Sequence, residues 1–314
     1  MPTNEARGAG IEVEGVVKRF GDHAALDGVT FHVEAGEVVG LLGPNGAGKT
    51  TAVNVLATLL RPDAGIARVA GYDVVADPDA VRRSISLTGQ FASLDDVLTG
   101  FENLVLFGRL RELSRSDARA KAGELLERFS LADAGDRPVS TYSGGMRRRL
   151  DLAASLVVPT PVLFLDEPTT GLDPRSRAEL WGVVRELRDG GLTVVLTTQY
   201  LEEADQLAER IVVLDRGSVV AEGTPNELKS RAGGQACVVA PVDAQRLDEV
   251  AALLADLGEV GLDRELGTAT LPDTGPALLT EVLRRLGEAG IEVADISLRR
   301  PTLDEVFLQL TEAS

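Results

Sequence analysis

The chain has 314 residues, of which 32 are Lys or Arg and 49 are Asp or Glu, so its formal net charge is −17. At about 100–200 residues per domain, this length predicts two domains, each able to bury a core. The acidity disfavours nucleic acid as a partner, because phosphates attract basic surfaces. The single cysteine cannot form an internal disulfide, and the first residues lack a secretory pattern. No apolar run reaches the eighteen or so residues of a spanning helix, so we expect a cytosolic chain whose membrane association comes through a partner.

Two kinds of strand pattern occur before residue 229. Residues 11–20, 28–33 and 67–69 are short runs punctuated by turn residues, which suit a small antiparallel sheet. Farther along, buried strands alternate with amphipathic helices such as the one expected at 174–188, and this alternation predicts a mostly parallel sheet with crossover helices. The strands expected in that sheet are residues 38–42, 84–87, 162–165, 194–198 and 211–214.

A helical segment interrupts this α/β core. Residues 99–158 have a predominantly helical pattern, with polar faces rich in Arg and Glu. We therefore expect a helical subdomain over about residues 91–158.

A change in composition near residues 229–234, where a Gly-Gly pair follows a helical stretch, predicts a boundary between domains at 1–229 and 230–314. From residue 230 onward there are seven Arg and fifteen Asp or Glu, so this part carries a net charge of −8. Its pattern predicts a small α+β domain. The expected strands are 235–240, 269–271 and 291–297, and the expected helices are 244–257, 277–289 and a terminal one from residue 303.

A glycine-rich turn joins the strand at 38–42 to a helix expected at 51–60 and fits the phosphate-binding pattern G-x-x-x-x-G-K-[ST]. Its glycines let backbone N–H groups point at phosphate oxygens, and the helix N-terminus adds a favourable dipole. Lys49 is expected to hold the β- and γ-phosphates, and Thr50 offers a hydroxyl to Mg²⁺. The predicted nucleotide-binding residues of this turn are Gly43, Pro44, Asn45, Gly46, Ala47, Gly48, Lys49, Thr50 and Thr51.

Two adjacent carboxylates end the strand expected at 162–165. Asp166 can hold the metal's water shell, and Glu167 can polarise the attacking water. Successive side chains at a strand tip point in opposite directions, so the two carboxylates can serve different roles. With the phosphate loop upstream, the pair predicts Mg²⁺-dependent hydrolysis of a nucleotide.

Between these two elements, a Ser-Gly-Gly segment comes directly before a helix expected at 147–156, where its N-terminus makes a second position suited to an anion. The segment, Tyr142, Ser143, Gly144, Gly145 and Met146, resembles the Leu-Ser-Gly-Gly-Gln signature of ATP-binding-cassette (ABC) ATPases. The resemblance covers about residues 10–225. It implies an α/β P-loop NTPase cassette with a parallel core sheet, a small antiparallel β subdomain and a helical subdomain, and ATP and Mg²⁺ as cofactors.

Three further positions match the cassette pattern. Gln90 matches the glutamine that in the family contacts Mg²⁺ and relays the nucleotide state to a transmembrane partner. Phe20 occupies the place of the aromatic residue that stacks on adenine, although a core position at a strand end is the alternative. Asp173 resembles the aspartate that contacts the opposite subunit.

Two departures from the family pattern concern the switch and the signature. Gln199 stands where the family usually has a histidine that contacts the γ-phosphate. A glutamine amide can donate a hydrogen bond to phosphate but cannot carry a proton or a positive charge near neutral pH. Tyr142 and Met146 replace the usual leucine and glutamine, and they leave Ser143 and Gly145 intact.

Segments 142–151, 196–205 and 303–307 look like those of the daunorubicin-resistance type of drug-exporter ATPase. This resemblance implies an ATP-hydrolysing subunit that energises a separate transmembrane permease and lies on the cytoplasmic face of the cell membrane through it. In the family, each ATP lies between the phosphate loop of one subunit and the signature of the other, which implies a homodimer. The C-terminal extension is implied to support assembly.

Two other functions stay open. A soluble cassette ATPase of translation or DNA repair would have no membrane partner, but such relatives usually carry two cassettes or a long coiled-coil insertion, and this sequence has neither. The second is an ATP-binding regulator that hydrolyses slowly, which Gln199 suggests.

A few polar residues fall outside these motifs. Arg147, Arg148 and Arg149 form the dense basic run of the sequence, and we expect them to contact acidic neighbours or the nucleotide end rather than nucleic acid. His23 and His32 have no Cys or His at metal-ligand spacing, so structural or surface roles are expected for them.

Overall fold

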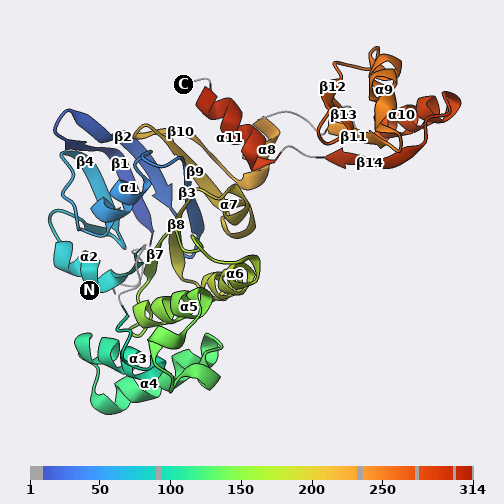
Figure 1. Ribbon diagram of the computed structural model, residues 1–314. Coiled ribbons are helices and arrows are strands. Elements are labelled where there is room, and N and C mark those ends of the chain that lie inside the picture. The colour runs from blue at the N-terminus through green and yellow to red at the C-terminus, as the bar shows by residue number, and fades with distance from the viewer. Residues whose placement is uncertain (1–9, 90–93, 232–235, 273–275, 300–301, 313–314) are drawn as a thin grey trace. The chain divides into compact units, whose positions relative to one another are not determined.

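The computed structural model describes residues 10–89, 94–231, 236–272, 276–299 and 302–312 (Figure 1). The chain separates into two compact units, residues 1–224 and 225–314. This division falls five residues before the expected one, because helix α8 (Pro225–Arg231) groups with the second unit. The limits 1–229 and 230–314 stay a prediction.

A six-stranded sheet forms the centre of the first unit, in the order β10-β9-β3-β8-β7-β6. All of its pairs are parallel except β10 with β9. The strands are β3 (Val38–Leu42), β6 (Ile85–Thr88), β7 (Val162–Asp166), β8 (Thr193–Thr198), β9 (Arg210–Asp215) and β10 (Ser218–Gly223). Every residue of β3, β7 and β8 is buried, as expected of parallel strands covered on both faces. The predicted parallel sheet is confirmed.

The strand expected at 84–87 begins one residue later than predicted. Ser84 ends helix α2 (Pro78–Ser84), and its hydroxyl donates a 2.9 Å hydrogen bond to the Ala80 carbonyl oxygen inside that helix. Strand β10 was not predicted, because its half-buried residues lack the continuous apolar pattern of the central strands.

A second, antiparallel sheet has the order β2-β1-β4-β5, which confirms the small antiparallel subdomain. Its strands are β1 (Ile11–Phe20), β2 (His23–Val33), β4 (Ala64–Val69) and β5 (Tyr72–Asp73). Strand β2 starts earlier than predicted, at His23, which pairs with Phe20 across a two-residue turn. This hairpin tip places both side chains at one end of the sheet.

Helices of the first unit cover the central sheet and form the segment between β6 and β7, drawn in green in Figure 1. They include α1 (Lys49–Leu56), α3 (Gly100–Leu110), α4 (Arg115–Arg128), α5 (Gly144–Ser155), α6 (Pro174–Asp189) and α7 (Leu201–Leu207). Helix α3 begins with a capping box in which Thr99 and Glu102 bond each other's backbone N–H groups. Short 3₁₀ turns, η1 (Ala132–Ala134) and η2 (Val139–Thr141), follow α4.

The two faces of the central sheet pack into separate cores because strand side chains alternate in direction. Phe164 of β7 faces the core shared with α1 and the antiparallel sheet. Its neighbours Leu163 and Leu165 face the opposite core, which includes Leu150 of α5 and Leu180 of α6. Strand β7 is thereby fixed from both sides, and so is its carboxyl end.

The second unit contains a four-stranded antiparallel sheet in the order β12-β13-β11-β14. Along the chain its elements are β11 (Ala236–Pro241), η3 (Ala244–Arg246), α9 (Leu247–Leu254), β12 (Gly261–Asp263), β13 (Thr268–Pro272), α10 (Pro276–Glu288) and β14 (Val293–Arg299), a split β-α-β arrangement. Cys237 and Val239 face a core that includes Val250 and Val282. The terminal helix α11 (Leu303–Glu312) contacts α8. The predicted α+β pattern is confirmed.

The strand expected at 291–297 begins at Val293 because the end of α10 occupies the residues before it. Gly290 adopts a φ of 63°, and the Ile291 amide donates a 2.9 Å hydrogen bond to the Leu286 carbonyl oxygen. The three-residue edge strand β12 was also missed, because it is too short to carry a pattern.

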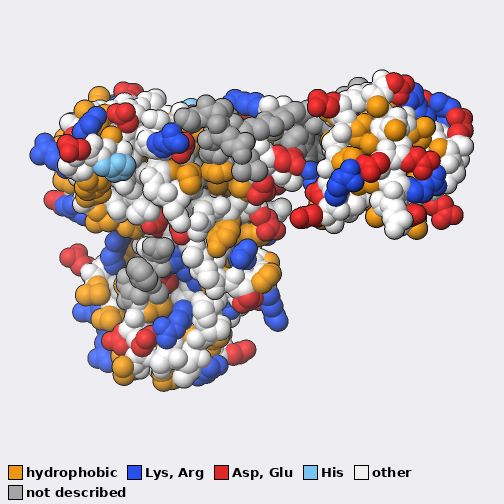
Figure 2. Space-filling model, turned by 45° about the horizontal axis from the view of Figure 1, so that its top comes forward, with side chains coloured by type: hydrophobic (Ala, Val, Ile, Leu, Met, Phe, Trp, Pro, Cys, Tyr) orange, Lys and Arg blue, Asp and Glu red, His pale blue; other side chains and the backbone are white. Residues whose placement is uncertain are grey.

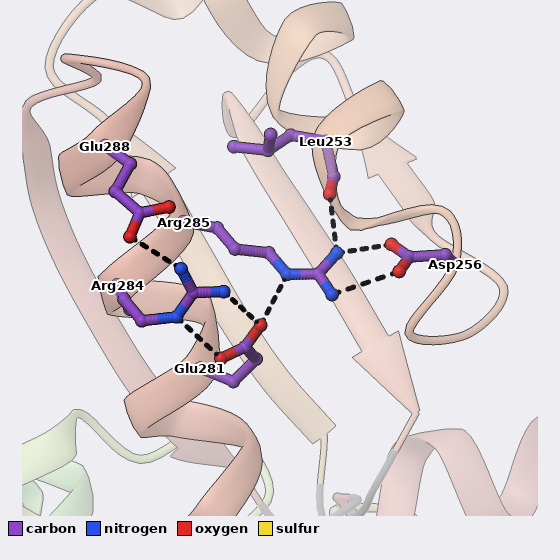
Figure 3. Close-up of polar contacts among 6 residues, drawn as sticks. All are labelled: Leu253, Asp256, Glu281, Arg284, Arg285 and Glu288. Carbon is purple, nitrogen blue, oxygen red and sulfur yellow. Dashed lines mark hydrogen bonds and ion pairs between the residues drawn. The ribbon is translucent and has the colours of Figure 1, made fainter.

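A charged network joins α9 to α10 (Figure 3). The Arg285 guanidinium donates to the Leu253 carbonyl oxygen at 3.1 Å, to Glu281 at 2.7 Å and to both oxygens of Asp256. Arg284 bonds Glu281 and Glu288 on the outer side of α10. Acidic and basic side chains accordingly lie next to each other over the surface of this unit (Figure 2).

None of the helices in the described part of the chain combines the length and the apolar composition that a membrane span requires.

Candidate active site

The phosphate loop lies between β3 and the N-terminus of α1. Gly48 is the N-cap of α1 and has a φ of 105°, in the left-handed region. A Cβ atom at Gly48 would come within 2.4 Å of the Ala25 carbonyl oxygen, and one at Gly43 within 2.3 Å of the Leu214 carbonyl oxygen. The glycines of the motif therefore let the loop curl tightly at the start of the helix.

Lys49 is buried at the base of this loop. Its Nζ atom donates hydrogen bonds to the Gly43 carbonyl oxygen at 2.7 Å and to the Pro44 carbonyl oxygen at 3.0 Å. Burial lowers the pKa of Lys49, and the carboxylates of Glu167 and Asp166 act in the opposite direction. The ammonium group is thus held in the loop by neutral acceptors, with two carboxylates nearby.

Asp166 lies at the carboxyl end of β7 and is buried. Its Oδ1 atom accepts a hydrogen bond from Thr50 Oγ1 at 3.2 Å and another from Thr197 Oγ1 of β8. The phosphate loop and the carboxylate strand therefore meet at Asp166. Hydroxyl and carboxylate oxygens are the ligands that Mg²⁺ prefers, so this pair fits the metal.

Glu167 follows β7 in an uncommon backbone conformation, with a φ of 46°. Its amide donates to the Thr197 carbonyl oxygen at 3.2 Å and to Thr197 Oγ1 at 3.0 Å. Thr170 Oγ1 donates to Glu167 Oε2 at 3.2 Å. The two bonds to Thr197 hold the Glu167 backbone, and the bond from Thr170 holds its carboxylate.

A cleft of about 300 Å³ opens above the loop. Its lining combines phosphate-loop residues and Glu167 with residues from the tip of the β1–β2 hairpin. The cleft is lined by Phe20, His23, Ala25, Asn45, Gly46, Gly48, Lys49, Thr50, Thr51 and Glu167. Phe20 is half exposed rather than a core residue, which rules out the alternative reading of this position. His23 and Ala25 are the lining residues that sequence reasoning missed.

The signature residues Ser143, Gly144 and Gly145 are not among the residues that line this cleft. Ser143 is the N-cap of α5, and its hydroxyl accepts a 3.3 Å hydrogen bond from the Met146 amide, so the Met146 substitution leaves the cap intact. Gly144 begins the helix. A Cβ atom at Gly145 would come within 2.4 Å of Ser176 Oγ, so only glycine fits between α5 and α6.

Asp173 caps the next helix, α6. Its carboxylate accepts from the Ser176 amide at 3.0 Å and from Ser176 Oγ at 2.8 Å. Both bonds lower the pKa of Asp173, and the bond from the Ser176 amide has the larger effect. Gln199 comes directly after β8 and is half-buried, and Gln90 lies outside the described residues.

Arg148 of the basic run is buried and connects the signature helix to the ends of two central strands. Its guanidinium donates to the carbonyl oxygens of Gly89 at 2.7 Å, Pro168 at 2.8 Å and Asp166 at 3.0 Å, and contacts Asp151 at 3.4 Å. Burial lowers the pKa of Arg148, and the neighbouring carboxylates, of which Asp151 has the largest effect, act in the opposite direction. Sequence reasoning did not distinguish this arginine from its two neighbours.

The other two arginines of the run contact acidic neighbours, as predicted. Arg147 lies 2.7 Å from Asp96, and Arg149 pairs with Glu179 of α6. Each arginine of the run therefore has an acidic partner within the chain, whereas the buried Arg149 Nε atom has no hydrogen-bond partner among the described residues.

Nearby, the Glu203 carboxylate of α7 is buried and accepts from Trp181 Nε1 at 3.2 Å. Burial raises the pKa of Glu203, and hydrogen bonds and the positive charge of Arg148 oppose this effect. The helix after the switch position is thus anchored by a buried polar contact.

A phosphate loop at the carboxyl edge of a parallel sheet, facing the carboxylates of a neighbouring strand, defines a P-loop nucleotide-binding protein. Comparison with known families makes this assignment specific. A family model described as ABC transporter matches residues 26–170. A second, described as ATP-binding protein DrrA1-3-like, C-terminal domain, matches residues 223–311.

Curated relatives match along almost the whole chain. Daunorubicin resistance ATP-binding protein DrrA3 of Streptomyces coeruleorubidus is 60% identical over 302 residues, covering 96% of this chain and 95% of that protein. Doxorubicin resistance ATP-binding protein DrrA of Mycobacterium tuberculosis is 56% identical over 309 residues, covering 96% and 93%. The chain belongs to the family of ABC transporter ATP-binding proteins, and its reaction is ATP hydrolysis coupled to transport.

Solved structures agree with this assignment. The ADP conformation of MJ1267, an ATP-binding cassette of an ABC transporter, matches with a TM-score of 0.63 and 27% identity, covering 69% of this chain and 91% of that one. The dimeric post-hydrolysis state of the cassette MJ0796 bound to ADP and phosphate matches with a TM-score of 0.62 and 28% identity, covering 68% and 98%. The predicted ABC cassette fold is confirmed.

Proposed function

We propose that this chain hydrolyses MgATP to energise a drug exporter whose membrane-spanning permease is a separate subunit. The observation that carries the proposal is the convergence of Lys49, Thr50 and Glu167 on one cleft, in a chain whose relatives are named for daunorubicin and doxorubicin resistance. Residues 1–229 would form the ATP-binding domain and residues 230–314 an accessory domain for assembly. The chain would act at the cytoplasmic face of the cell membrane, held there by its permease.

Binding of the triphosphate begins at the phosphate loop. The backbone of Gly43 to Gly48 and the N-terminus of α1 favour an anion. Lys49 bonds two neutral carbonyl oxygens, and phosphate oxygens are stronger acceptors because they are charged. We therefore expect Nζ to exchange these carbonyls for the β- and γ-phosphates. Thr50, Asp166 and Gln90 would hold Mg²⁺, which supplies charge neutralisation at those phosphates.

Hydrolysis requires a polarised water beside the γ-phosphate. The Glu167 carboxylate lines the cleft and can accept a hydrogen bond from that water, and so act as the general base. Gln199 would donate an amide hydrogen bond to the γ-phosphate from the end of β8. The rate enhancement then comes mainly from positioning and charge stabilisation.

Completion of the site calls for a second copy of the chain. Ser143, Gly144, Gly145 and Asp173 do not line the cleft of their own chain in the described structure. We propose that they contact the ATP held by the phosphate loop of the partner, which gives a homodimer with two ATP molecules. The dimeric cassette among the matching structures supports this arrangement.

A groove of about 340 Å³ between α1, β6, α3 and α5 is the proposed docking site for the permease. Its walls combine Phe107 and the exposed Leu59 with Arg111, the acidic Asp151, and Arg82, which pairs with Asp79. Such a mixed apolar and charged surface suits an amphipathic helix. Gly89, the residue before Gln90, also lines it, so docking and the nucleotide site adjoin.

The two alternatives receive less support. No observation favours a soluble cassette of translation or DNA repair, because the resistance-named relatives match 96% of the chain. An ATP-binding regulator would differ from an exporter ATPase in its low rate of hydrolysis, and the steady-state rate of MgATP hydrolysis by the unaltered chain distinguishes the two.

Glu167→Gln tests the proposed activity. We expect the steady-state rate of MgATP hydrolysis to fall at least 100-fold, because the general base is lost, while MgATP binding persists. Lys49→Ala is the control that should lose binding as well. Phosphate release measures the hydrolysis rate, and equilibrium binding measures the MgATP affinity. Normal turnover by Glu167→Gln would contradict the assignment of Glu167 as the general base.

A further inference from the structure

His23 and Phe20 are two exposed rings that line the nucleotide cleft. They are cross-strand partners at the tip of the β1–β2 hairpin, and both line the cleft. Directly opposed residues of an antiparallel pair have Cβ atoms about 4.5–5.5 Å apart, so the two rings are neighbours. The chain has two histidines, and this one lies in the cleft.

The end of β1 that carries Phe20 is held in place by contacts of the two preceding residues. Asp63 accepts a 2.6 Å hydrogen bond from the Arg19 amide and a 3.0 Å bond from Lys18 Nζ. The same Lys18 ammonium lies 5.7 Å from the centre of the Phe20 ring. The end of β1 is thereby anchored before any ligand arrives, and an anchored ring loses less conformational entropy on binding.

The cleft is lined by two chemically different groups of residues. Gly46, Gly48, Lys49 and Thr50 provide backbone N–H groups, a cation and a hydroxyl, which suit phosphates. Phe20 and His23 provide flat π surfaces, which suit a nucleobase. A nucleotide whose phosphates lie on the loop therefore has its base and ribose directed towards the hairpin tip.

We propose that His23 is a nucleotide-binding residue that contacts the base-and-ribose half of ATP together with Phe20. Its imidazole can stack as Phe20 does, and its ring nitrogens add a donor and an acceptor that phenyl lacks. This assignment rests on the proposed ATP site and adds a contact residue to it.

His32 supplies a matched control on the same strand. It lies near the other end of β2, with Nε2 3.7 Å from Glu34 Oε1, and does not line the cleft. Both histidines are exposed, so replacement of either should leave the fold intact.

The test compares a ligand that has a base with one that lacks it. Calorimetry on the full chain would measure the affinities of MgADP and of magnesium tripolyphosphate, neither of which requires turnover. We expect His23→Ala to weaken MgADP about tenfold, equivalent to about 1.4 kcal/mol, and to leave tripolyphosphate unchanged. His23→Tyr should restore most of the MgADP affinity because it keeps a stacking ring, and His32→Ala should match the unaltered protein.

Three results would overturn the assignment. One is His23→Ala binding MgADP as tightly as the unaltered chain does. Another is an equal loss of MgADP and tripolyphosphate affinity, which would indicate damage to the loop instead of a lost base contact. An unaltered chain that binds neither probe would refute the ATP site itself, and that outcome is distinguishable because no variant is needed to observe it.

Discussion

Glu167 combines an uncommon backbone conformation with the role proposed for its side chain. A φ of 46° is rare for a residue with a β-carbon, and two bonds from its amide to Thr197 hold it there. Thr197 also donates to Asp166, so one threonine holds both the Asp166 carboxylate and the Glu167 backbone. The two acids were predicted from their place after an apolar strand. Thr197 was not, because only the parallel pairing of β7 and β8 brings it beside them.

Gln199 gives a residue-scale prediction because it cannot change its charge. Gln199→Ala should lower kcat/KM for ATP about tenfold, through loss of a hydrogen bond to a charged group. Gln199→His should retain hydrolysis, and its rate relative to the unaltered chain should rise as the pH falls through about 6.5, where imidazole gains a proton. Hydrolysis rates of the three proteins from pH 6 to 8 measure this. A constant ratio across that range would mean that position 199 does not contact the phosphate.

At the scale of elements, long apolar strands and local motifs were predictable, and contacts between distant segments were not. Strand β7 and the phosphate loop carry their signals within a few residues. The burial of Arg148 does not, because consecutive helix residues point about 100° apart and the sequence does not say which of three arginines faces the core. The position of His23 in the cleft was not predictable either, because the hairpin, rather than any motif, brings it there.

Arg148 is expected to hold the signature helix to the catalytic loop of its own chain. Arg148→Met removes the donor to three carbonyl oxygens and also removes the buried positive charge beside Asp151. The free energy of unfolding should therefore fall by about 3 kcal/mol. Arg147→Met, which loses only the pair with Asp96, should cost no more than about 1 kcal/mol. Denaturant unfolding of both variants measures the difference. Equal midpoints would mean that the Arg148 contacts do not stabilise this junction.

The network of Figure 3 predicts an acid dependence for the second unit. Hydrogen bonds from Arg284 and then Arg285 lower the pKa of Glu281 from 4.5 to about 2. The stabilisation from ionised Glu281 is therefore complete above pH 4.5 and is lost as the pH falls towards 2. Glu281→Gln should melt at a lower temperature than the unaltered chain at pH 7, and the gap should narrow below pH 4.5.

Circular dichroism melting of the full chain at pH 7, 5 and 3.5 measures this gap. Glu292→Gln, an exposed position in the same unit, is the control and should melt like the unaltered chain throughout. A gap between Glu281→Gln and the unaltered chain that stays constant with pH would show that the carboxylate charge is not what stabilises α10.

At the scale of the whole molecule, one chain carries each part of the ATP site but does not bring all of them together. The phosphate loop and Glu167 line one cleft, whereas Ser143 and Gly145 lie at the start of α5, outside the residues that line it. Two chains would resolve this, because each could supply the signature to the other's nucleotide. The net charge of −17 disfavours attraction to anionic lipid, which agrees with the proposal that a permease holds the chain at the membrane.

The mass of the Glu167→Gln variant in MgATP, determined by light scattering, tests the central claim most directly. The chain has a mass of 33.2 kDa, and slow hydrolysis should let the nucleotide-bound dimer accumulate. We predict a particle of about twice this mass in MgATP, a single-chain mass without nucleotide, and no dimer when Ser143→Arg is added. A single-chain mass in MgATP, with nucleotide bound to the protein, would contradict the account.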